Sequence, residues 1–472
     1  MTMVDPDITA RLKDAAGAQG WSEEPGEIAP HLSEWRGRWH GRSSLLLKPA
    51  NTEAIARILA ICNQTRTTIV PQGGNTGLVG GQIPASGEVL LSLERMNRIR
   101  RISADENLLI AEAGVVLKEI QRAASEAGRL FPLSLAAEGS CTIGGNISTN
   151  AGGVHVLRYG MMRDLVLGLE VVLANGSILD LMKGLRKDNT GYDLKQLFIG
   201  AEGTLGVITA AMLKLFPQPA SYVTVLAAIP AVSSALPILN DLQYASGGQV
   251  QAFEIMQRRA IELVLREIPG TSNPLTGTHE WLLLIEIGNS AALNSTEAAE
   301  QVLSRAIERD LVTDAVFASS LKQREELWRL RESIPEAQRK QGKSIANDVS
   351  VPLARLGEFV DTAEAAVRAV LTHALPMTFG HAGDGNLHFA ILAPDHQDAL
   401  EPARSAIESA VQECVWRFNG SISAEHGIGI ARREALARQK QVEEIATMAA
   451  LKRALDPGNI LNPGKLLPAG LP

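Results

Sequence analysis

The spacing of apolar and polar residues changes along the chain between the period of a helix and the period of a strand. In residues 51–62 the apolar side chains share one helical face, and Asn51 precedes them as an N-terminal cap. Runs with the character of strands lie at residues 108–111, 165–173 and 178–181. Asn175-Gly176 separates the last two runs and predicts a tight hairpin between them.

Beyond the loop-forming sequence Pro217-Gln-Pro219, strand-like and helical patterns alternate, so we expect a second domain to begin there. The predicted strands are residues 223–229, 253–256, 282–287 and 347–351. The predicted helices are one that ends near Tyr244, a charged amphipathic helix at 323–340 and a helix at 398–418. This order predicts an α+β domain with an antiparallel sheet.

The chemically most informative run is His381-Ala-Gly-Asp-Gly-Asn-Leu-His388. Apolar, strand-forming residues flank it on both sides, so Asp384-Gly385 predicts a hairpin with a two-residue loop. In that register His381 faces His388 across the two strands. Directly opposed residues have Cβ atoms about 4.5–5.5 Å apart, a separation that suits two nitrogen ligands of one metal ion.

A carboxylate and a third imidazole follow in a glycine-flanked loop, at Glu425 and His426. Together with His381 and His388 they predict a mononuclear metal site with one side chain left over as a base. The alternative is that the two hairpin histidines are ordinary residues of a half-buried sheet.

Composition excludes several classes of function. Of the 472 residues, 45% are hydrophobic and 21% are charged, which is typical of a globular protein with well-formed cores. The net charge of −7 argues against a protein built to bind nucleic acid or anionic membranes, and we interpret Arg98, Arg100 and Arg101 as a solvated connector. No apolar stretch approaches the ~20 residues of a membrane span, and the N-terminus lacks the pattern of a secretory signal.

The cysteines Cys62, Cys141 and Cys414 are too few and too scattered for a disulfide framework. They also cannot supply the full set of thiolates that an iron–sulfur cluster needs within one chain. We therefore expect a cytoplasmic protein.

Two glycine-rich loops, residues 73–77 and 139–146, predict a binding site for a large anionic ligand. Glycine lets backbone N–H groups approach a phosphate closely, because no Cβ intervenes. Neither loop fits the G-x-G-x-x-G pattern of a strand-to-helix turn or the phosphate loop with its lysine. The pattern favours a dinucleotide bound outside a Rossmann fold, although glycines in such loops also make plain turns.

Several motifs resemble the flavin-binding domain of the vanillyl-alcohol-oxidase type. They are Pro71-Gln-Gly-Gly-Asn-Thr-Gly, Gly139-Ser-Cys-Thr-Ile-Gly-Gly-Asn, Thr149-Asn-Ala-Gly-Gly153 and Gly200-Ala-Glu-Gly-Thr-Leu-Gly206. The hairpin histidines, Glu425-His426-Gly427, Asn462-Pro-Gly-Lys465 and residues 185–195 extend the resemblance, which covers the chain from residue 35 onward. The whole set resembles FAD-dependent D-2-hydroxyacid dehydrogenases, most closely their D-2-hydroxyglutarate dehydrogenase branch.

The resemblance implies an α+β fold in three parts. Residues 1–218 would hold an N-terminal extension and a PCMH-type FAD-binding domain (38–217), residues 219–420 a substrate domain with an antiparallel sheet, and residues 421–472 a C-terminal helical segment that closes on the FAD domain. The implied FAD contacts are Pro71, Gln72, Gly73, Gly74, Asn75, Thr76, Gly77, Leu78, Gly139, Ser140, Cys141, Gly144, Gly145, Asn146, Thr149, Gly152, Glu202, Gly206, Ile208 and Asn462. Some relatives attach FAD to a histidine in the first glycine loop, which has none here, so we expect noncovalent FAD.

The resemblance and the chemistry of the residues together imply oxidation of a D-2-hydroxyacid. The metal ligands would be His381, His388 and Glu425, with Zn²⁺ favoured over Mn²⁺ or Co²⁺. His426 would be the general base. A carboxylate-binding arginine is implied at Arg331, and Asn386 is a further candidate for substrate binding or else serves the turn.

One departure concerns the substrate. Similar enzymes commonly carry a substrate-binding lysine where this chain has Ala346, and Lys343 is the nearest replacement. We expect D-2-hydroxyglutarate first and D-malate next. A D-lactate dehydrogenase, the FAD subunit of a glycolate oxidase complex and a zinc hydrolase stay open as alternatives. The resemblance further suggests an electron-transfer flavoprotein as electron acceptor, and we expect a homodimer.

Overall fold

The computed structural model describes residues 5–185, 187–289, 295–393, 400–468 and 470–471. The chain forms two compact units: the first combines Met1–Gly152, Met161–Gln218 and Glu425–Pro472, and the second combines Gly153–Gly160 and Pro219–Ala424. The division after Gln218 falls in the loop-forming sequence. The sequence did not indicate that Gly153–Gly160 belongs with the second unit, and the limits of the functional domains stay predictions.

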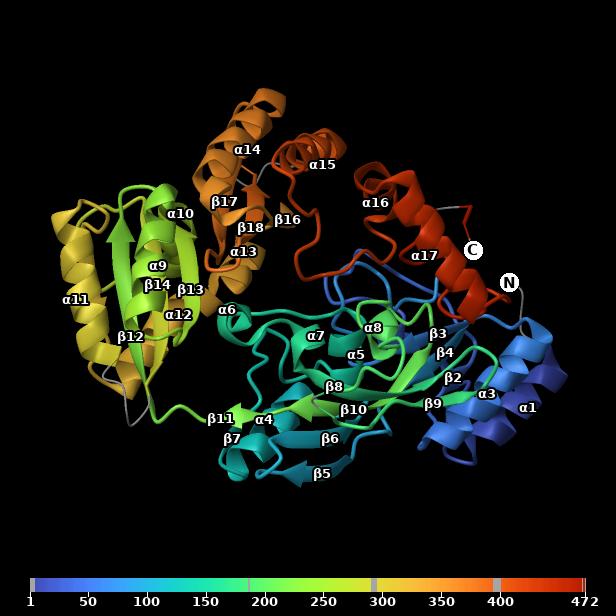
Figure 1. Cartoon of the computed structure of the whole chain (residues 1–472). Coiled ribbons are helices and arrows are strands. Elements are labelled where there is room, and N and C mark those ends of the chain that lie inside the picture. The colour runs from blue at the N-terminus through green and yellow to red at the C-terminus, as the bar shows by residue number, and fades with distance from the viewer. Residues whose placement is uncertain (1–4, 186, 290–294, 394–399, 469, 472) are drawn as a thin grey trace. The chain divides into compact units, whose positions relative to one another are not determined.

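Among the described residues the first unit contains three sheets and a set of mostly short helices (Figure 1). Its helices are α1 (Pro6–Ala16), α2 (Pro25–Ile28), α3 (Thr52–Thr65), α4 (Leu117–Glu126), α5 (Ile143–Ser148), α7 (Met162–Leu165), α8 (Lys195–Phe198), α16 (Arg433–Gln439) and α17 (Val442–Leu455). The sheets have the strand orders β1-β2-β4-β3, β5-β6-β10-β8-β9 and β11-β7. Their strands are β1 (Trp21–Ser22), β2 (Leu46–Leu47), β3 (Ile69–Gln72), β4 (Val89–Ser92), β5 (Ile99–Ser103), β6 (Leu108–Glu112), β7 (Arg129–Leu130), β8 (Val166–Val172), β9 (Ile178–Asp180), β10 (Val207–Lys214) and β11 (Phe216–Pro217).

Two local predictions in this unit are confirmed. Asn51 caps α3, because its side chain accepts a hydrogen bond from the Ala54 N–H at 2.9 Å. The strands β8 and β9 form an antiparallel hairpin around Asn175-Gly176, and Gly176 supplies the positive φ, +85°, that the turn requires.

The interpretation of Arg98, Arg100 and Arg101 as a solvated connector is confirmed for their exposure and wrong for the structure that carries them. All three side chains are exposed, but residues 99–103 form strand β5, and Arg98 and Arg100 contact the buried Glu112 of β6. Arg98 Nη2 donates to Glu112 Oε1 at 2.9 Å and Arg100 Nε donates to the same oxygen at 3.3 Å. A buried carboxylate needs partners of this kind, because burying an unpaired charge is costly.

Within the described ranges, the second unit is built on one seven-stranded sheet with the order β15-β12-β14-β13-β17-β18-β16. The strands are β12 (Ser221–Ile229), β13 (Val250–Gln257), β14 (Trp281–Asn289), β15 (Asp314–Phe317), β16 (Ser344–Ser350), β17 (Leu375–His381) and β18 (Asn386–Leu392). The helices are α6 (Val156–Tyr159), α9 (Ala235–Ala245), α10 (Arg258–Glu267), α11 (Ser295–Glu308), α12 (Leu321–Glu332), α13 (Ile334–Gln341), α14 (Leu356–Val370) and α15 (Leu400–Arg417).

Every neighbouring pair in this sheet is antiparallel, so the predicted α+β class is confirmed. Buried side chains of α10, α12 and α13 pack with one face of the central strands in a single core cluster. The strands β13 and β14 are buried along nearly their whole length, which explains why β14 is a nearly continuous apolar run rather than an alternating one.

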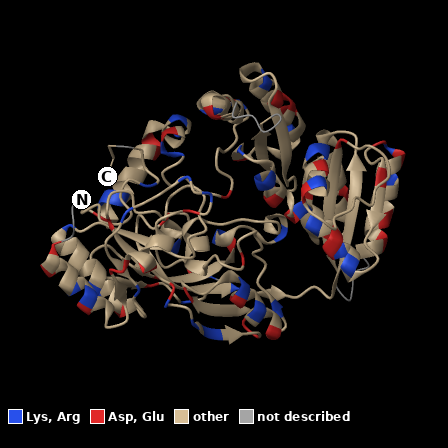
Figure 2. Ribbon diagram, turned by 180° about the vertical axis from the view of Figure 1, so that it is seen from behind, with Lys and Arg blue, Asp and Glu red and all other residues tan. Residues whose placement is uncertain are grey.

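No helix in the described ranges has the length and apolar character that a membrane crossing requires. Lys and Arg residues are interspersed with Asp and Glu along the helices of the second unit (Figure 2). Both signs of charge therefore occur together on this unit.

The single helix predicted at 323–340 is wrong, because the structure contains two. α12 ends at Glu332, and α13 begins at Ile334 with Pro335 in its first turn. Proline has no N–H to donate, and its ring collides with the carbonyl four residues earlier in a continuous helix. The predicted helix at 398–418 corresponds to α15, although Asp398 itself lies outside the described residues.

The hairpin that carries the two histidines forms, but its predicted register is wrong. The last residue of β17, His381, pairs with Asn386 at the start of β18. His388 pairs with Phe379 instead of with His381. The loop therefore spans residues 382–385 rather than Asp384-Gly385 alone.

Turn chemistry explains the longer loop. A two-residue loop of the favoured kind needs positive φ at both central residues. Gly385 has a φ of +83°, whereas Asp384 stays outside that region. The N–H of Asp384 donates to His381 O at 3.2 Å, and its carboxylate accepts from the Asn386 N–H at 3.1 Å, so a wider turn closes around Asp384.

Candidate active site

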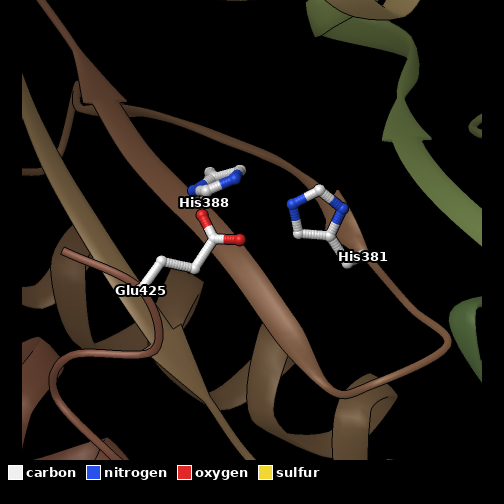
Figure 3. Close-up of side chains that lie close together, drawn as sticks. All are labelled: His381, His388 and Glu425. Carbon is white, nitrogen blue, oxygen red and sulfur yellow. The ribbon is translucent and has the colours of Figure 1, made fainter. Parts of the chain in front are cut away.

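His381 and His388 lie on the same face of their hairpin, on a diagonal. Their ring centroids are 5.4 Å apart and the rings are steeply inclined, at 79°. Glu425 directly follows the last residue of the second unit, and a β-bridge between Ser350 and Ser421 holds the chain that leads to it. Ligand atoms of His381, His388 and Glu425 lie within 4.8 Å of one another, and the three side chains face each other (Figure 3).

This donor set fits one divalent cation. Two imidazole nitrogens and a carboxylate oxygen suit Zn²⁺, which binds such atoms at about 2 Å and keeps a further position open in catalytic sites. Mn²⁺ and Co²⁺ accept similar ligands. A second group of ligand atoms within 4.8 Å of one another comprises Asp348, Glu425 and His426, so the predicted base lies beside the predicted ligands.

Two buried side chains of the second unit hold His381. His381 Nδ1 lies 2.6 Å from Glu254 Oε1. Arg331 donates to Glu254 Oε2 through Nε and Nη2, both at 2.8 Å, and its guanidinium lies 4.9 Å from the ring centroid of Phe379. Burial alone would raise the pKa of Glu254, but the contacts with His381 and Arg331 bring it below its ordinary value.

A further carboxylate lies beside His388. Asp348 of β16 is buried, is the direct cross-strand partner of His388, and has Oδ1 3.9 Å from His388 Nδ1. Asn386 donates through Nδ2 to Asp348 Oδ1 and to Val349 O, both at 2.9 Å. Asn386 Oδ1 is buried and accepts no hydrogen bond from the described residues, so it can accept one from a ligand.

The sequence did not identify Glu254 or Asp348 as parts of the site. One signal in the sequence could have identified them: β13 and β16 each contain a single acidic residue and no other charge. An acidic residue in such a strand predicts a buried carboxylate that is paired with a hydrogen-bond donor or a cation. The identity of the partner depends on strand pairing, which the sequence did not give.

The residues expected to bind substrate take different positions. Arg331 is buried and near His381, as described. Ala346 lies two residues before Asp348 in β16 and thus on the same face of the strand. Lys343 precedes β16 and is exposed. The structure therefore brings Arg331 and Asn386 to the histidine cluster, but not Lys343.

The two glycine-rich loops of the first unit lie against each other. A Cβ on Gly73 would stand 2.3 Å from Thr142 Oγ1, and one on Gly74 would stand 2.0 Å from Ser140 O. Any side chain at these two positions would overlap the second loop, so the close approach requires glycine. The loops thus form one surface, as a single dinucleotide site requires.

Buried polar atoms in this unit accept or donate no hydrogen bond within the described residues: Thr142 Oγ1, Asn146 Oδ1 and Asn462 Oδ1. Leaving such a group unsatisfied costs about 1–3 kcal/mol, so these atoms are available to a polar ligand. The Asn462 amide is oriented by donation to Gly81 O at 2.9 Å and Glu202 O at 2.7 Å. These residues fit the predicted FAD.

Two predicted FAD contacts use their side chains within the protein. Gln72 Nε2 donates to His31 O and to Gln82 O, both at 3.0 Å. Asn75 Nδ2 donates to Ser33 O at 2.9 Å. The side chains of Gln72 and Asn75 therefore shape the first loop. The backbone N–H groups of that loop are left to face a phosphate.

Glu202, another predicted FAD contact, also uses its carboxylate within the protein. Its carboxylate accepts the N–H groups of Ile428 and Gly429, both at 2.7 Å. Burial raises its pKa, while the two backbone donors oppose that shift. Glu202 therefore holds the loop that follows His426.

The other predicted FAD contacts also belong to the first unit. They are Pro71 in β3, Thr76, Gly77 and Leu78 after it, Gly139, Ser140 and Cys141, Gly144 and Gly145 in α5, Thr149 and Gly152 after that helix, Gly206, and Ile208 in β10. Two of them are closely packed within the unit: a Cβ on Gly206 would stand 2.7 Å from Val171 Cγ1, and Cys141 is buried, which raises the pKa of its thiol to about 11.

Known proteins match the chain along most of its length. Residues 43–182 match the domain family described as "FAD binding domain", and residues 218–466 match the domain family described as "FAD linked oxidases, C-terminal domain". The mitochondrial D-2-hydroxyglutarate dehydrogenase of Arabidopsis thaliana is 38% identical over 99% of this chain and 83% of its own length. The D-2-hydroxyglutarate dehydrogenase of Xanthomonas citri pv. viticola is 37% identical over 98% of this chain and 97% of its own.

Among solved structures, p-cresol methylhydroxylase with bound substrate has a TM-score of 0.79 to this chain, at 16% identity and covering 99% of this chain and 98% of that one. A likeness at this identity shows the fold alone. It confirms the predicted PCMH-type architecture.

Proposed function

Because this chain belongs to the family of FAD-dependent D-2-hydroxyacid dehydrogenases, we propose that it oxidises a D-2-hydroxyacid to the 2-oxoacid at a site that contains a metal ion as well as FAD. The observation that carries the proposal is the set His381, His388 and Glu425, whose ligand atoms lie within 4.8 Å of one another. Family membership favours this reaction over a zinc hydrolase, which would use the same ligands without a flavin.

A 2-hydroxyacid must lose its hydroxyl proton and its α-hydride. His426 accepts the hydroxyl proton, because a neutral imidazole is a competent base near neutral pH. The ion that His381, His388 and Glu425 would hold supplies Lewis acidity, which makes a coordinated hydroxyl easier to deprotonate. FAD, when bound by the two glycine loops, supplies the hydride acceptor.

Substrate binding falls to Arg331 and Asn386. A guanidinium has five N–H donors in a fixed fork, and Arg331 uses only its Nε and Nη2 edge for Glu254. Its remaining donors suit a substrate carboxylate. Asn386 Oδ1 is a buried acceptor that suits a hydroxyl donor.

The favoured substrate is D-2-hydroxyglutarate, because both relatives are named D-2-hydroxyglutarate dehydrogenase, and D-malate is next. A second carboxylate distinguishes both from D-lactate. Ala346 favours the D-lactate alternative, because it offers no cation for that second carboxylate on the face of β16 that carries Asp348.

A panel of D- and L-2-hydroxyacids with one artificial electron acceptor tests the substrate. We expect the highest kcat/KM for D-2-hydroxyglutarate, with D-malate below it and the L-acids inactive. Preference for D-lactate would contradict the two-carboxylate part, and preference for any L-acid would contradict the stereochemical part. Activity of the isolated chain also separates this proposal from a glycolate oxidase subunit that works only in its complex.

FAD is expected to be noncovalent, because residues 71–81 contain no histidine. Acid precipitation should leave the yellow flavin in solution, and flavin that stays with the washed pellet would contradict this. The electron-transfer flavoprotein as acceptor, the homodimer and the cytoplasmic location are further parts of the proposal that rest on the resemblance and the composition.

A further inference from the structure

Glu254 is a buried carboxylate that the proposed reaction does not use. It is the direct cross-strand partner of His381, and its Oε1 lies 2.6 Å from Nδ1 of that ring. Its other oxygen, Oε2, accepts from Nε and Nη2 of Arg331, both at 2.8 Å. Each oxygen of this carboxylate therefore has one neighbour, the imidazole or the guanidinium.

The same sheet contains a second carboxylate of this kind, Glu286 in β14. Its Oε2 accepts from Arg324 Nε at 2.7 Å, from Trp328 Nε1 at 2.7 Å and from Thr224 Oγ1 at 3.0 Å, and its Oε1 accepts from Arg324 Nη2 at 2.9 Å. None of these three partners, Arg324, Trp328 and Thr224, has a neutral nitrogen with a lone pair that could bind a metal ion. Glu286 is thus a matched structural counterpart of Glu254.

The contact with Glu254 determines what His381 can do. An ionised carboxylate has only lone pairs to offer, so the hydrogen of the 2.6 Å contact comes from His381 Nδ1. In a neutral ring with its hydrogen on Nδ1, the lone pair is on Nε2. The contact also fixes the rotation of the ring about its bond to Cβ.

We propose that Glu254 is a positioning residue for the metal site: it holds His381 in the Nδ1–H tautomer, so that Nε2 is the metal-binding atom, and Arg331 holds Glu254 in turn. This inference rests on the proposed metal site and deepens it. A carboxylate behind a ligating histidine fixes the ring and makes its other nitrogen more basic, and losing such a partner typically weakens metal binding by 10–100-fold.

The test measures the Zn²⁺ affinity of the purified full chain by competition with a chromophoric chelator. Glu254→Gln should weaken the affinity about 10–100-fold. The matched control, Glu286→Gln, removes the equivalent buried charge of the same sheet and should leave the affinity within about twofold. Circular dichroism of both variants shows that they are folded when they are compared.

A second variant separates orientation from general damage. The side-chain amide oxygen introduced by E254Q cannot accept from both His381 and Arg331, because the other terminal atom of the amide is a donor. Adding Arg331→Met removes the competing donor and lets that oxygen accept from His381 Nδ1. The double variant E254Q/R331M should therefore bind Zn²⁺ more tightly than E254Q alone, which a merely structural role of Glu254 does not predict.

The outcomes distinguish this inference from the proposed function. A wild-type chain that binds no Zn²⁺ would overturn the metal site and the role of Glu254 together. Equal affinities of wild type and E254Q, or an equal loss in E286Q, would overturn the role of Glu254 alone. If E254Q does not fold, ¹⁵N imidazole shifts of the zinc-free wild type decide: a hydrogen on Nδ1 of His381 is expected, and a hydrogen on Nε2 would overturn the inference.

Discussion

Two Arg–Glu pairs of the second unit, each with a buried glutamate, are built alike and have different neighbours. α12 supplies both arginines, Arg324 and Arg331, two helical turns apart on one side of the helix. Their partners Glu286 and Glu254 lie on adjacent strands and on the same face of the sheet. Each glutamate also contacts the residue directly opposite it on the next strand: Thr224 for Glu286, and His381 for Glu254.

The difference between the pairs lies in those other contacts. Trp328 and Thr224 complete the first pair with donors that have no further chemistry, so Glu286 serves the fold. An imidazole has a second ring nitrogen, so the contact of Glu254 with His381 can act on whatever that nitrogen binds. In this sheet, the ion pair that indicates function is therefore the one whose glutamate also contacts a side chain with a second reactive atom.

The largest expected effect comes from a change that keeps the contact of residue 381 with Glu254 but removes the ring nitrogen that would bind the metal. In His381→Asn, the amide nitrogen is as many bonds from the main chain as Nδ1, so it can still donate to Glu254. We expect near-normal thermal stability, but loss of bound Zn²⁺ and of hydroxyacid oxidation, because a ligand is missing. His388→Ala should lose metal and activity in the same way.

Elemental analysis measures the zinc content of these two variants, calorimetry measures their thermal stability, and the assay with an artificial electron acceptor measures hydroxyacid oxidation. His279→Ala is the control, because it removes an imidazole of the same unit whose Nε2 lies 2.7 Å from the carbonyl oxygen of Thr276. Retention of zinc and activity in H381N would contradict the assignment of His381 as a ligand.

The next largest effect concerns the base. His426→Ala should leave zinc content nearly unchanged and lower kcat by about 10²–10⁴, the usual range for a lost general base. Zinc content and kcat are measured on the same preparation. If H426A lost its metal while Glu425→Ala kept it, the ligand and the base would be exchanged in this account.

A change in the structural pair should affect stability alone. Trp328→Phe keeps the aromatic packing and removes one hydrogen bond to the buried Glu286 carboxylate. Hydrogen bonds to charged groups are worth about 1.5–3 kcal/mol, and the free energy of unfolding should fall by about that amount. Denaturant titration measures the loss, and a changed Zn²⁺ affinity would contradict the separation of the two pairs.

The smallest effect concerns the buried carboxylate of Glu112 in the first unit and its two exposed partners, Arg98 and Arg100. Burial would raise the pKa of Glu112, but hydrogen bonds and charge from Arg98 and Arg100 lower it below 4.5. A carboxylate with a lowered folded-state pKa stabilises the fold above its unfolded pKa, and that stability is lost as the pH falls through the folded pKa.

Glu112→Gln should therefore cost about 1–2 kcal/mol of unfolding free energy at pH 7. The difference from wild type should shrink below about pH 4, where the wild-type carboxylate also becomes protonated. Unfolding curves at a series of pH values check this. A difference that grew toward acid pH would contradict the sign, and zinc affinity should not change.

The sequence predicted the elements of the site better than their contacts. The hairpin at 375–392 follows from its apolar flanks and glycine-rich turn, but its register depends on the φ of Asp384, which the dipeptide Asp-Gly leaves open. Two histidines predicted to face each other directly are diagonal neighbours, and they still come together because long side chains span that diagonal.

Contacts set by tertiary pairing were beyond the sequence. Glu254 meets His381 only because β13 pairs with β17, strands more than a hundred residues apart in the chain. Glu202 meets the N–H groups of Ile428 and Gly429 in the same way, across most of the first unit's sequence. Local patterns determine burial and turns, whereas these partners are fixed by how distant strands and loops pack.

The central claim is that a metal ion bound by His381, His388 and Glu425 is required for hydroxyacid oxidation, independently of FAD. The direct test treats the purified protein with a chelator, removes the chelator, and measures metal content, flavin absorbance and activity on one sample. We predict that metal and activity disappear together, that flavin absorbance stays, and that Zn²⁺ restores turnover. Full activity with no detectable metal would contradict the account and return the two histidines to ordinary residues of a hairpin.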